Sequence, residues 1–206
     1  MPRTRGSALA AVVIVLGWAA AAVAGPPTEQ VQQYTDHVQQ ILNDPSLKQA
    51  DKREAVRKVA EQVFDVNETA KRALGIHWQK RTPAEREEFV QLFADLLEST
   101  YIAKIDLYGG EKVQYTGELV DGDYAIVRAK IVTKQRTEVP VEAKMLKRGE
   151  RWLIYDIAIE NVSLVGNYRS QFDRIIRTSS YEELVKRLKT KRDEFLPRKE
   201  PRPARS

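Results

Sequence analysis

Reactive side chains are few in this sequence, and histidine is the first residue type to consider for catalysis or metal binding. His37 and His77 are the only two, and neither lies in a metal-ligand spacing such as H-E-x-x-H, so we expect no metal site. We expect His77 to be either packed in the interior or exposed on the surface. The chain has no cysteine, which rules out disulfides and thiol catalysis. It also lacks a G-x-S-x-G elbow, a P-loop and a dinucleotide fingerprint, and we expect no cofactor.

Asp156 and Glu160 are spaced as two carboxylates on one face of a strand. Four residues along a strand span roughly 13 Å, which is too far for the two groups to share a proton. Three basic residues are expected on the same face of the sheet: Arg128, Lys130 and Lys144. Surface ion pairs are therefore the favoured interpretation. An acid–base site that combines Asp156 with Tyr155 or Tyr168 stays open as the alternative.

The elements that would position these residues begin with helices. Apolar residues at helical spacing, bounded by capping residues, predict helices over 29–42, 51–64, 67–74, 83–108, 163–176 and 180–195. Asp51-Lys52-Arg53-Glu54 resembles a capping box, and Thr82-Pro83-Ala84-Glu85 is the strongest helix start. At about 1.5 Å per residue, the helix that follows Thr82 is long enough to back an entire sheet. The three helices before it are expected to be peripheral.

Four strands are predicted over 112–120, 123–133, 138–147 and 151–160. Asp121-Gly122 is a strong signal for a tight hairpin, so the strands form an antiparallel meander in an α+β fold. Alternation gives the last three strands a shared apolar face. Its rows are Ala125, Val127, Ala129 and Ile131, then Val139, Val141, Ala143 and Met145, then Leu153, Tyr155, Ile157 and Ile159.

The two ends of the chain differ from its body. Residues 1–24 combine Arg3 and Arg5, an apolar run and an A-x-A site at Ala22 to Ala24, which predicts a cleaved signal peptide and hence export; a membrane anchor is the alternative. A single domain is expected over 25–196. Residues 197–206 form a basic Pro/Arg-rich tail that we expect to be disordered. Without both ends, cations and anions are equal in number, so nucleic acid is not an expected partner.

The segment from Trp152 to Phe172 runs from an apolar strand into an amphipathic helix and contains no recognisable catalytic group. Its pattern W-x-x-Y-D-(I/V)-x-(I/V)-E-x-V-S-L-V-x-N-Y-R-x-Q-F resembles the strand-to-helix segment of the MlaC family, also called the toluene-tolerance family. Three further segments resemble family patterns and keep the family's order: F-D at Phe64, A-L-G-x-x-W at Ala73 and T-P-x-(E/Q) at Thr82. The tail is not part of the resemblance.

The resemblance implies a fold and a function. The fold would be a curved four-stranded antiparallel sheet, NTF2-like in character, covered by about six helices with an apolar pocket between them. The function would be that of a periplasmic phospholipid carrier, not an enzyme, with the lipid as cargo. It would exchange glycerophospholipid between an inner-membrane MCE/ABC transporter complex and an outer-membrane lipoprotein complex, and so maintain outer-membrane lipid asymmetry.

The residues predicted to contact lipid follow from the resemblance and from which face of an element they occupy. They are Phe93, Leu97, Tyr101, Val127, Ala129, Ile131, Val141, Ala143, Met145, Leu153, Tyr155, Ile157, Leu164, Tyr168 and Phe172. From the residues alone, a filled core is favoured over a lipid pocket, since small strand residues often accommodate an aromatic ring of a covering helix. A periplasmic enzyme on the same kind of fold and a protein-only adaptor are the competing functions.

Overall fold

The computed structural model describes residues 26–102 and 110–195. The predicted signal peptide over 1–24, the tail over 197–206 and the end of the helix predicted over 83–108 lie outside these residues. The domain limits therefore stay predictions. Within the described ranges, no helix is both long and apolar enough to cross a membrane.

Six α-helices and one 3-10 helix are found in the described part of the chain. They are α1 (Pro26–Asn43), α2 (Gln49–Val63), α3 (Val66–Leu74), η1 (Gly75–Lys80), α4 (Pro83–Tyr101), α5 (Leu164–Thr178) and α6 (Tyr181–Phe195). The six α-helices correspond to the predicted ones. The capping box predicted at Asp51 is wrong: α2 already begins at Gln49, and its N-cap Lys48 makes no side-chain hydrogen bond. In the turn before α2, the Asp44 carboxylate accepts hydrogen bonds from the Ser46 N–H and hydroxyl.

The sheet has five antiparallel strands in sequential order, not the four predicted. They are β1 (Lys112–Asp121), β2 (Tyr124–Val132), β3 (Glu138–Arg148), β4 (Arg151–Ile159) and β5 (Val162–Ser163). The fifth strand forms because Glu160 and Asn161 both have positive φ angles, 49° and 65°, as a two-residue hairpin turn requires. A strand of two residues is too short to leave an alternating pattern in the sequence. The predicted hairpin at Asp121-Gly122 is confirmed, with Asp121 paired to Tyr124.

β4 contains a bulge that changes which side chains share a face. Lys144 pairs with Asp156, but its neighbour Met145 pairs with Ile154, so Tyr155 is an extra residue in the ladder. Leu153 and Tyr155 were predicted to share a face with Ile157 and Ile159, and the register shows that they do not. Trp152 and Ile154 share that face instead. A strict period of two cannot reveal an inserted residue.

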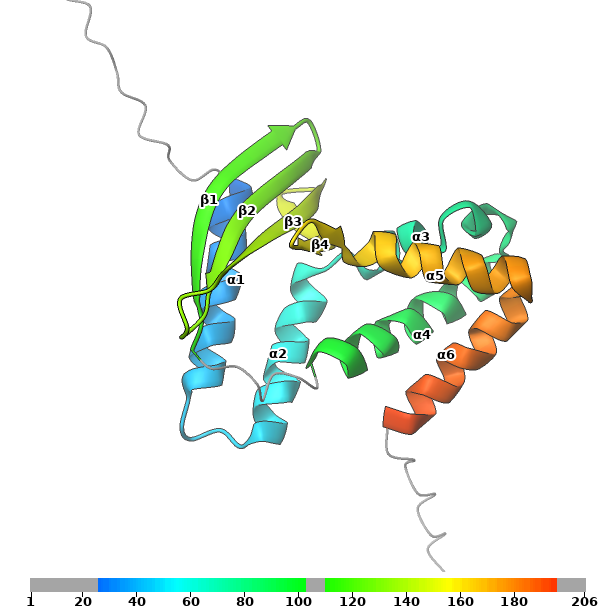
Figure 1. Cartoon of the computed structure of the whole chain (residues 1–206), viewed down its shortest axis with the longest axis horizontal. Helices are drawn as coiled ribbons and strands as arrows, with labels where there is room; N and C mark the ends of the chain where they lie inside the picture. Colours follow the sequence, from blue (N-terminus) through cyan, green and yellow to red (C-terminus); the bar gives the residue numbers. More distant parts are fainter. Residues whose placement is uncertain (1–25, 103–109, 196–206) are drawn as a thin grey trace, which may run out of the picture.

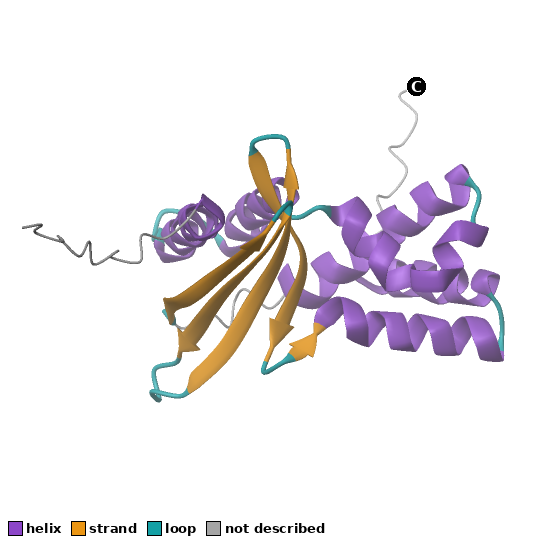
Figure 2. Ribbon diagram, turned by 90° about the horizontal axis from the view of Figure 1, so that it is seen from above, coloured by secondary structure: helices purple, strands orange, loops and turns teal. Residues whose placement is uncertain are grey.

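The apolar face of the sheet is covered by α1 and α2, not by α4 as predicted (Figures 1 and 2). The sheet contributes Ala125, Val127, Ala143, Met145, Trp152 and Ile154, which pack with Val59 and Val63 of α2. Partly buried residues pack against this cluster from α1, which contributes Val31, Tyr34, Val38 and Ile41, and from elsewhere, namely Phe64, Tyr115 and Ile157. The Gln30 side chain fastens α1 to β4 by hydrogen bonds to both the backbone N–H and the carbonyl of Trp152, each 2.9 Å long.

The long helix α4 instead belongs to a second core, built with α3, α5 and α6 beyond the end of the sheet (Figure 1). Phe89, Phe93, Tyr168 and Phe172 form an aromatic cluster there, with ring centroids 5.2 to 5.9 Å apart. The predicted capping box of α4 is confirmed: Thr82 and Glu85 each accept a hydrogen bond from the other's backbone N–H. The periodicity of α4 therefore showed an apolar stripe, but not what covers it.

Phe64 and Asp65 join the two cores. Phe64 makes a parallel bridge with Ile154, and the Asp65 N–H donates to the Ile154 carbonyl over 2.8 Å. The Asp65 carboxylate caps α3 by accepting from the Glu68 N–H, and it also pairs with Arg148 at 2.9 Å. The F-D motif thus fixes where α2 ends, where α3 begins and how both meet the sheet.

Candidate functional site

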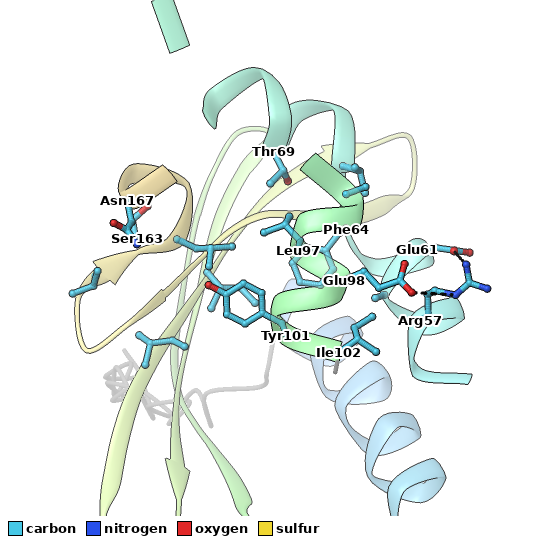
Figure 3. A pocket seen from close by; sticks show the side chains of 17 residues that line it. Arg57, Glu61, Phe64, Thr69, Leu97, Glu98, Tyr101, Ile102, Ser163 and Asn167 are labelled. Carbon is cyan, nitrogen blue, oxygen red and sulfur yellow. Dashed lines mark ion pairs between the residues drawn. The ribbon is translucent and has the colours of Figure 1, made fainter. Parts of the chain in front are cut away.

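A cavity of about 470 Å³ lies where these two parts of the molecule meet (Figure 3). Its volume is within the range of small-molecule sites. The helices contribute Phe64 at the end of α2, Val66 of α3, and Ala94, Leu97, Tyr101 and Ile102 from the end of α4. The opposite wall consists of Ile157, Ile159, Val162 and Leu164, from β4, β5 and the start of α5. Most of the wall is therefore apolar.

The cavity is open to solvent beside the β4–β5 turn and also at its α2–α4 end, where charged side chains line it. Tyr101, Ile159 and Val162 line it, and they retain 44%, 45% and 64% of their accessible surface. Burial raises the pKa of Tyr101 to about 12, with a further contribution from the neighbouring phenol of Tyr168. The Tyr101 hydroxyl therefore stays neutral at physiological pH, as suits an apolar wall.

A buried carboxylate holds the β5–α5 corner of the cavity in place. Asp156 is 4% exposed and accepts hydrogen bonds from the Ser163 hydroxyl at 2.6 Å and from the Val165 N–H at 3.0 Å. Ser163 in turn caps α5 by accepting a hydrogen bond from the Gly166 N–H. The predicted ion pair with Lys144 is present at 3.1 Å. Asp156 itself is not on the surface as predicted, because the start of α5 covers it.

Four charged side chains meet at the end of the cavity between α2 and α4. Arg57, Glu61 and Glu98 line the wall, and Arg57 is 3.6 Å from Glu61 and 3.8 Å from Glu98. Glu54 pairs with Arg57 at 2.5 Å. Partial burial raises the pKa of Glu98, and the nearby Arg57 opposes this shift. In Figure 3, Arg57, Glu61 and Glu98 lie on the opposite side of Tyr101 from Ser163 and Asn167.

The predicted lipid contacts fall into five places. Four line the cavity: Leu97, Tyr101, Ile157 and Leu164. Three lie in or against the helical core: Phe93, Tyr168 and Phe172. Three are buried under α1 and α2: Val127, Ala143 and Met145. Three continue the same sheet face and are partly buried: Ala129, Ile131 and Val141. Leu153 and Tyr155 are on the other face, where Arg72 stacks on the Tyr155 ring at 4.0 Å. Whether any of them contacts lipid stays a prediction.

Several wall residues were not among the predicted contacts. Phe64 and Ile159 carried a usable signal, since one lies in the F-D motif and the other lies on the predicted apolar face. Arg57, Glu61 and Glu98 carried none, because a charged residue on an amphipathic helix normally indicates a solvated face. Their position depends on how α2 and α4 meet, which helical periodicity does not specify.

The groups considered for catalysis have structural partners. His77 is buried, and its Nε2 is 2.9 Å from the Asp173 carboxylate. Tyr168 packs in the aromatic cluster, and the Asp156 carboxylate is held by three donors. Among the described residues, no three His, Asp or Glu side chains are grouped as a metal site would need.

Comparison with known proteins identifies the family. The sequence profile of the MlaC protein family matches residues 32–190, which is most of the chain. The chain belongs to the MlaC family. A solved structure with the same fold is a phospholipid-binding protein from Ralstonia solanacearum, determined in complex with a phospholipid. It is 23% identical to this MlaC-family chain, the match covers 83% of this chain and 99% of that one, and the TM-score is 0.71.

Proposed function

We propose that this protein binds a phospholipid in the cavity between α2, α4 and β4 and carries it through the periplasm. The observation that carries the proposal is the cavity itself, with apolar walls from six elements and an opening to solvent. Family membership and the phospholipid-bound structural relative support the same conclusion. Catalysis is not part of the proposal.

The energetics favour an occupied cavity. The apolar wall of this open cavity faces water when no ligand is bound, which is unfavourable. An acyl chain covers the wall and gains about 0.8 kcal/mol for each methylene taken out of water. Cargo and carrier therefore stabilise each other.

Family membership supports a wider role as a proposal. The protein would receive glycerophospholipid from one membrane complex and deliver it to another, with an inner-membrane MCE/ABC transporter and an outer-membrane lipoprotein complex as partners. Export through a cleaved signal peptide would place it between these membranes. A protein-only adaptor would need a filled interior in place of the cavity.

Lipid content of the purified protein tests the binding step. Extraction under denaturing conditions and mass spectrometry should find about one phospholipid per protein, and less than a tenth of an equivalent would overturn the proposal. Ala94→Trp fills the cavity from its α4 wall and should remove most of the lipid. Ala84→Trp is the matched control, because Ala84 is an exposed residue at the start of the same helix.

A further inference from the structure

Charge is distributed unevenly around the cavity. The side chains that line it in the described structure include one cation, Arg57, and two carboxylates, Glu61 and Glu98, all at the end between α2 and α4. The opposite end offers only the uncharged polar groups of Ser163 and Asn167 (Figure 3). A ligand with an apolar body and a charged end would therefore be oriented by this difference.

The charged end is open to water and can be rearranged. The side chains of Arg57, Glu61 and Glu98 retain 37%, 61% and 41% of their accessible surface. Arg57 contacts the last two at 3.6 and 3.8 Å, longer than good charge-assisted hydrogen bonds. Exposed ion pairs of this kind are weak. A ligand can therefore replace these two contacts at little cost. The shorter Arg57–Glu54 pair, 2.5 Å, is also exposed, with 37% and 46% of the two side chains accessible, and a phosphate bound by Arg57 would compete with Glu54.

The composition of this rim favours one class of headgroup. Glu54 and Lys58 extend the cluster, with Lys58 3.6 Å from Glu54, so that three carboxylates face two cations among the described residues of the cluster. A headgroup that carries only a phosphate would gain Arg57 but would face the excess of carboxylates. A headgroup with both a phosphate and an ammonium group satisfies both signs.

We propose that the α2–α4 rim recognises zwitterionic phospholipids, with Arg57 binding the phosphate and Glu61 and Glu98 binding the ammonium group. The inference rests on the proposed function, because it assumes that the acyl chains occupy the cavity. Guanidinium and phosphate form strong charge-assisted hydrogen bonds, and an ammonium group donates up to three to carboxylates. The acyl chains then extend from the rim past Leu97 and Tyr101 into the cavity.

The alternative is that these residues only fasten α2 to α4. Arg57–Glu98 is the one ion pair recorded between these helices in the described residues, and its 3.8 Å separation makes it a weak fastening. An ion pair that only joins α2 to α4 would contribute to the free energy of unfolding, but it would not change the relative affinity for two lipids. Selectivity therefore separates the two roles.

The test is a competition between lipids. The purified, delipidated full chain is incubated with vesicles of equal amounts of phosphatidylethanolamine and phosphatidylglycerol, re-isolated, and its lipids are quantified by mass spectrometry. We expect phosphatidylethanolamine to be enriched about threefold to fivefold, the preference that an exposed ion pair supplies. The enrichment should decrease at high salt, because the rim is exposed.

Variants assign the preference to the rim. The double change Glu61→Gln with Glu98→Gln leaves Arg57 in place and should reduce the enrichment to below about 1.5-fold. Arg57→Gln should lower the total amount of both lipids. The control is Glu88→Gln, since Glu88 is also on α4 but pairs with Lys189 of α6 at 2.6 Å. It should bind lipid like the unmodified protein.

The outcomes separate this inference from the proposed function. Equal amounts of the two lipids in the unmodified protein, or an enrichment that survives the double change, would overturn the rim's role while leaving the carrier proposal intact. Absence of bound lipid from the unmodified protein would overturn both.

Discussion

One face of the sheet passes through two different environments along β3 and β4. Before the bulge, Trp152 and Ile154 are 6% and 5% exposed and pack tightly against α1 and α2. After it, Ile157 and Ile159 line the cavity, and Ile159 keeps 45% of its surface exposed. The residue types are alike in both parts. The covering helices, not the composition of the strand, therefore decide which part is filled and which is hollow.

The largest expected effect compares two isoleucines of the same strand. Ile154→Ala should lower the free energy of unfolding by about 3 kcal/mol, because it leaves a void in a filled core. Ile157→Ala should cost about 1 kcal/mol or less in lipid-free protein, because the side chain already borders a cavity. Urea unfolding of both variants measures the difference. Equal losses would mean that the two parts are packed alike.

A second comparison concerns carboxylates on the other face of the sheet. Asp156→Ala should cost about 2–3 kcal/mol, because it leaves the Val165 N–H and Lys144 without their partner near the start of α5. Glu142→Ala removes an exposed pair with Arg128, 3.0 Å apart, and should cost less than about 1 kcal/mol. Thermal unfolding of both variants would show whether Asp156 fixes the β5–α5 corner of the cavity. A small loss for Asp156→Ala would remove it from that role.

The smallest effect is a pH dependence at the charged rim. Partial burial raises the pKa of Glu98 above its ordinary value of 4.5, so the folded protein binds the proton more tightly than the unfolded chain. The free energy of unfolding therefore decreases as the pH rises through the window that begins near 4.5.

Glu98→Gln should remove this contribution and make the variant relatively more stable at pH 7 than at pH 4. The gain should stay below about 1 kcal/mol, because the group is partly exposed. Unfolding titrations at the two pH values, with Glu88→Gln as the control, measure it. A variant that loses stability at pH 7 relative to pH 4 would contradict the sign.

The elements of this fold were predictable because local signals set them. Thr82 and Glu85 form the expected capping box, Gly75 ends α3 with a positive φ angle, and the registers of β2 and β3 follow the alternation. What covers each element was not predictable. The apolar stripe of α4 looks the same whether it packs on a sheet or on other helices, and here it packs on α3 and α6.

The residues of the candidate site were likewise predictable only in part. Leu97 and Leu164 were predicted from the faces they occupy, and both line the cavity. Arg57 and Glu98 were not, because they come from helices that meet only in three dimensions. The bulge at Tyr155 was also invisible, since one extra residue leaves no mark on composition.

That extra residue makes its position tolerant of the loss of a single codon. Without Tyr155, Met145 would still pair with Ile154 and Lys144 with Asp156, so the ladder between β3 and β4 would become regular. Trp152, Ile154, Ile157 and Ile159 would keep the face that they share, because the deleted residue is the one without a partner on β3. The loss would be local: the Arg72 contact with the Tyr155 ring and the additional twist that a bulge gives a strand.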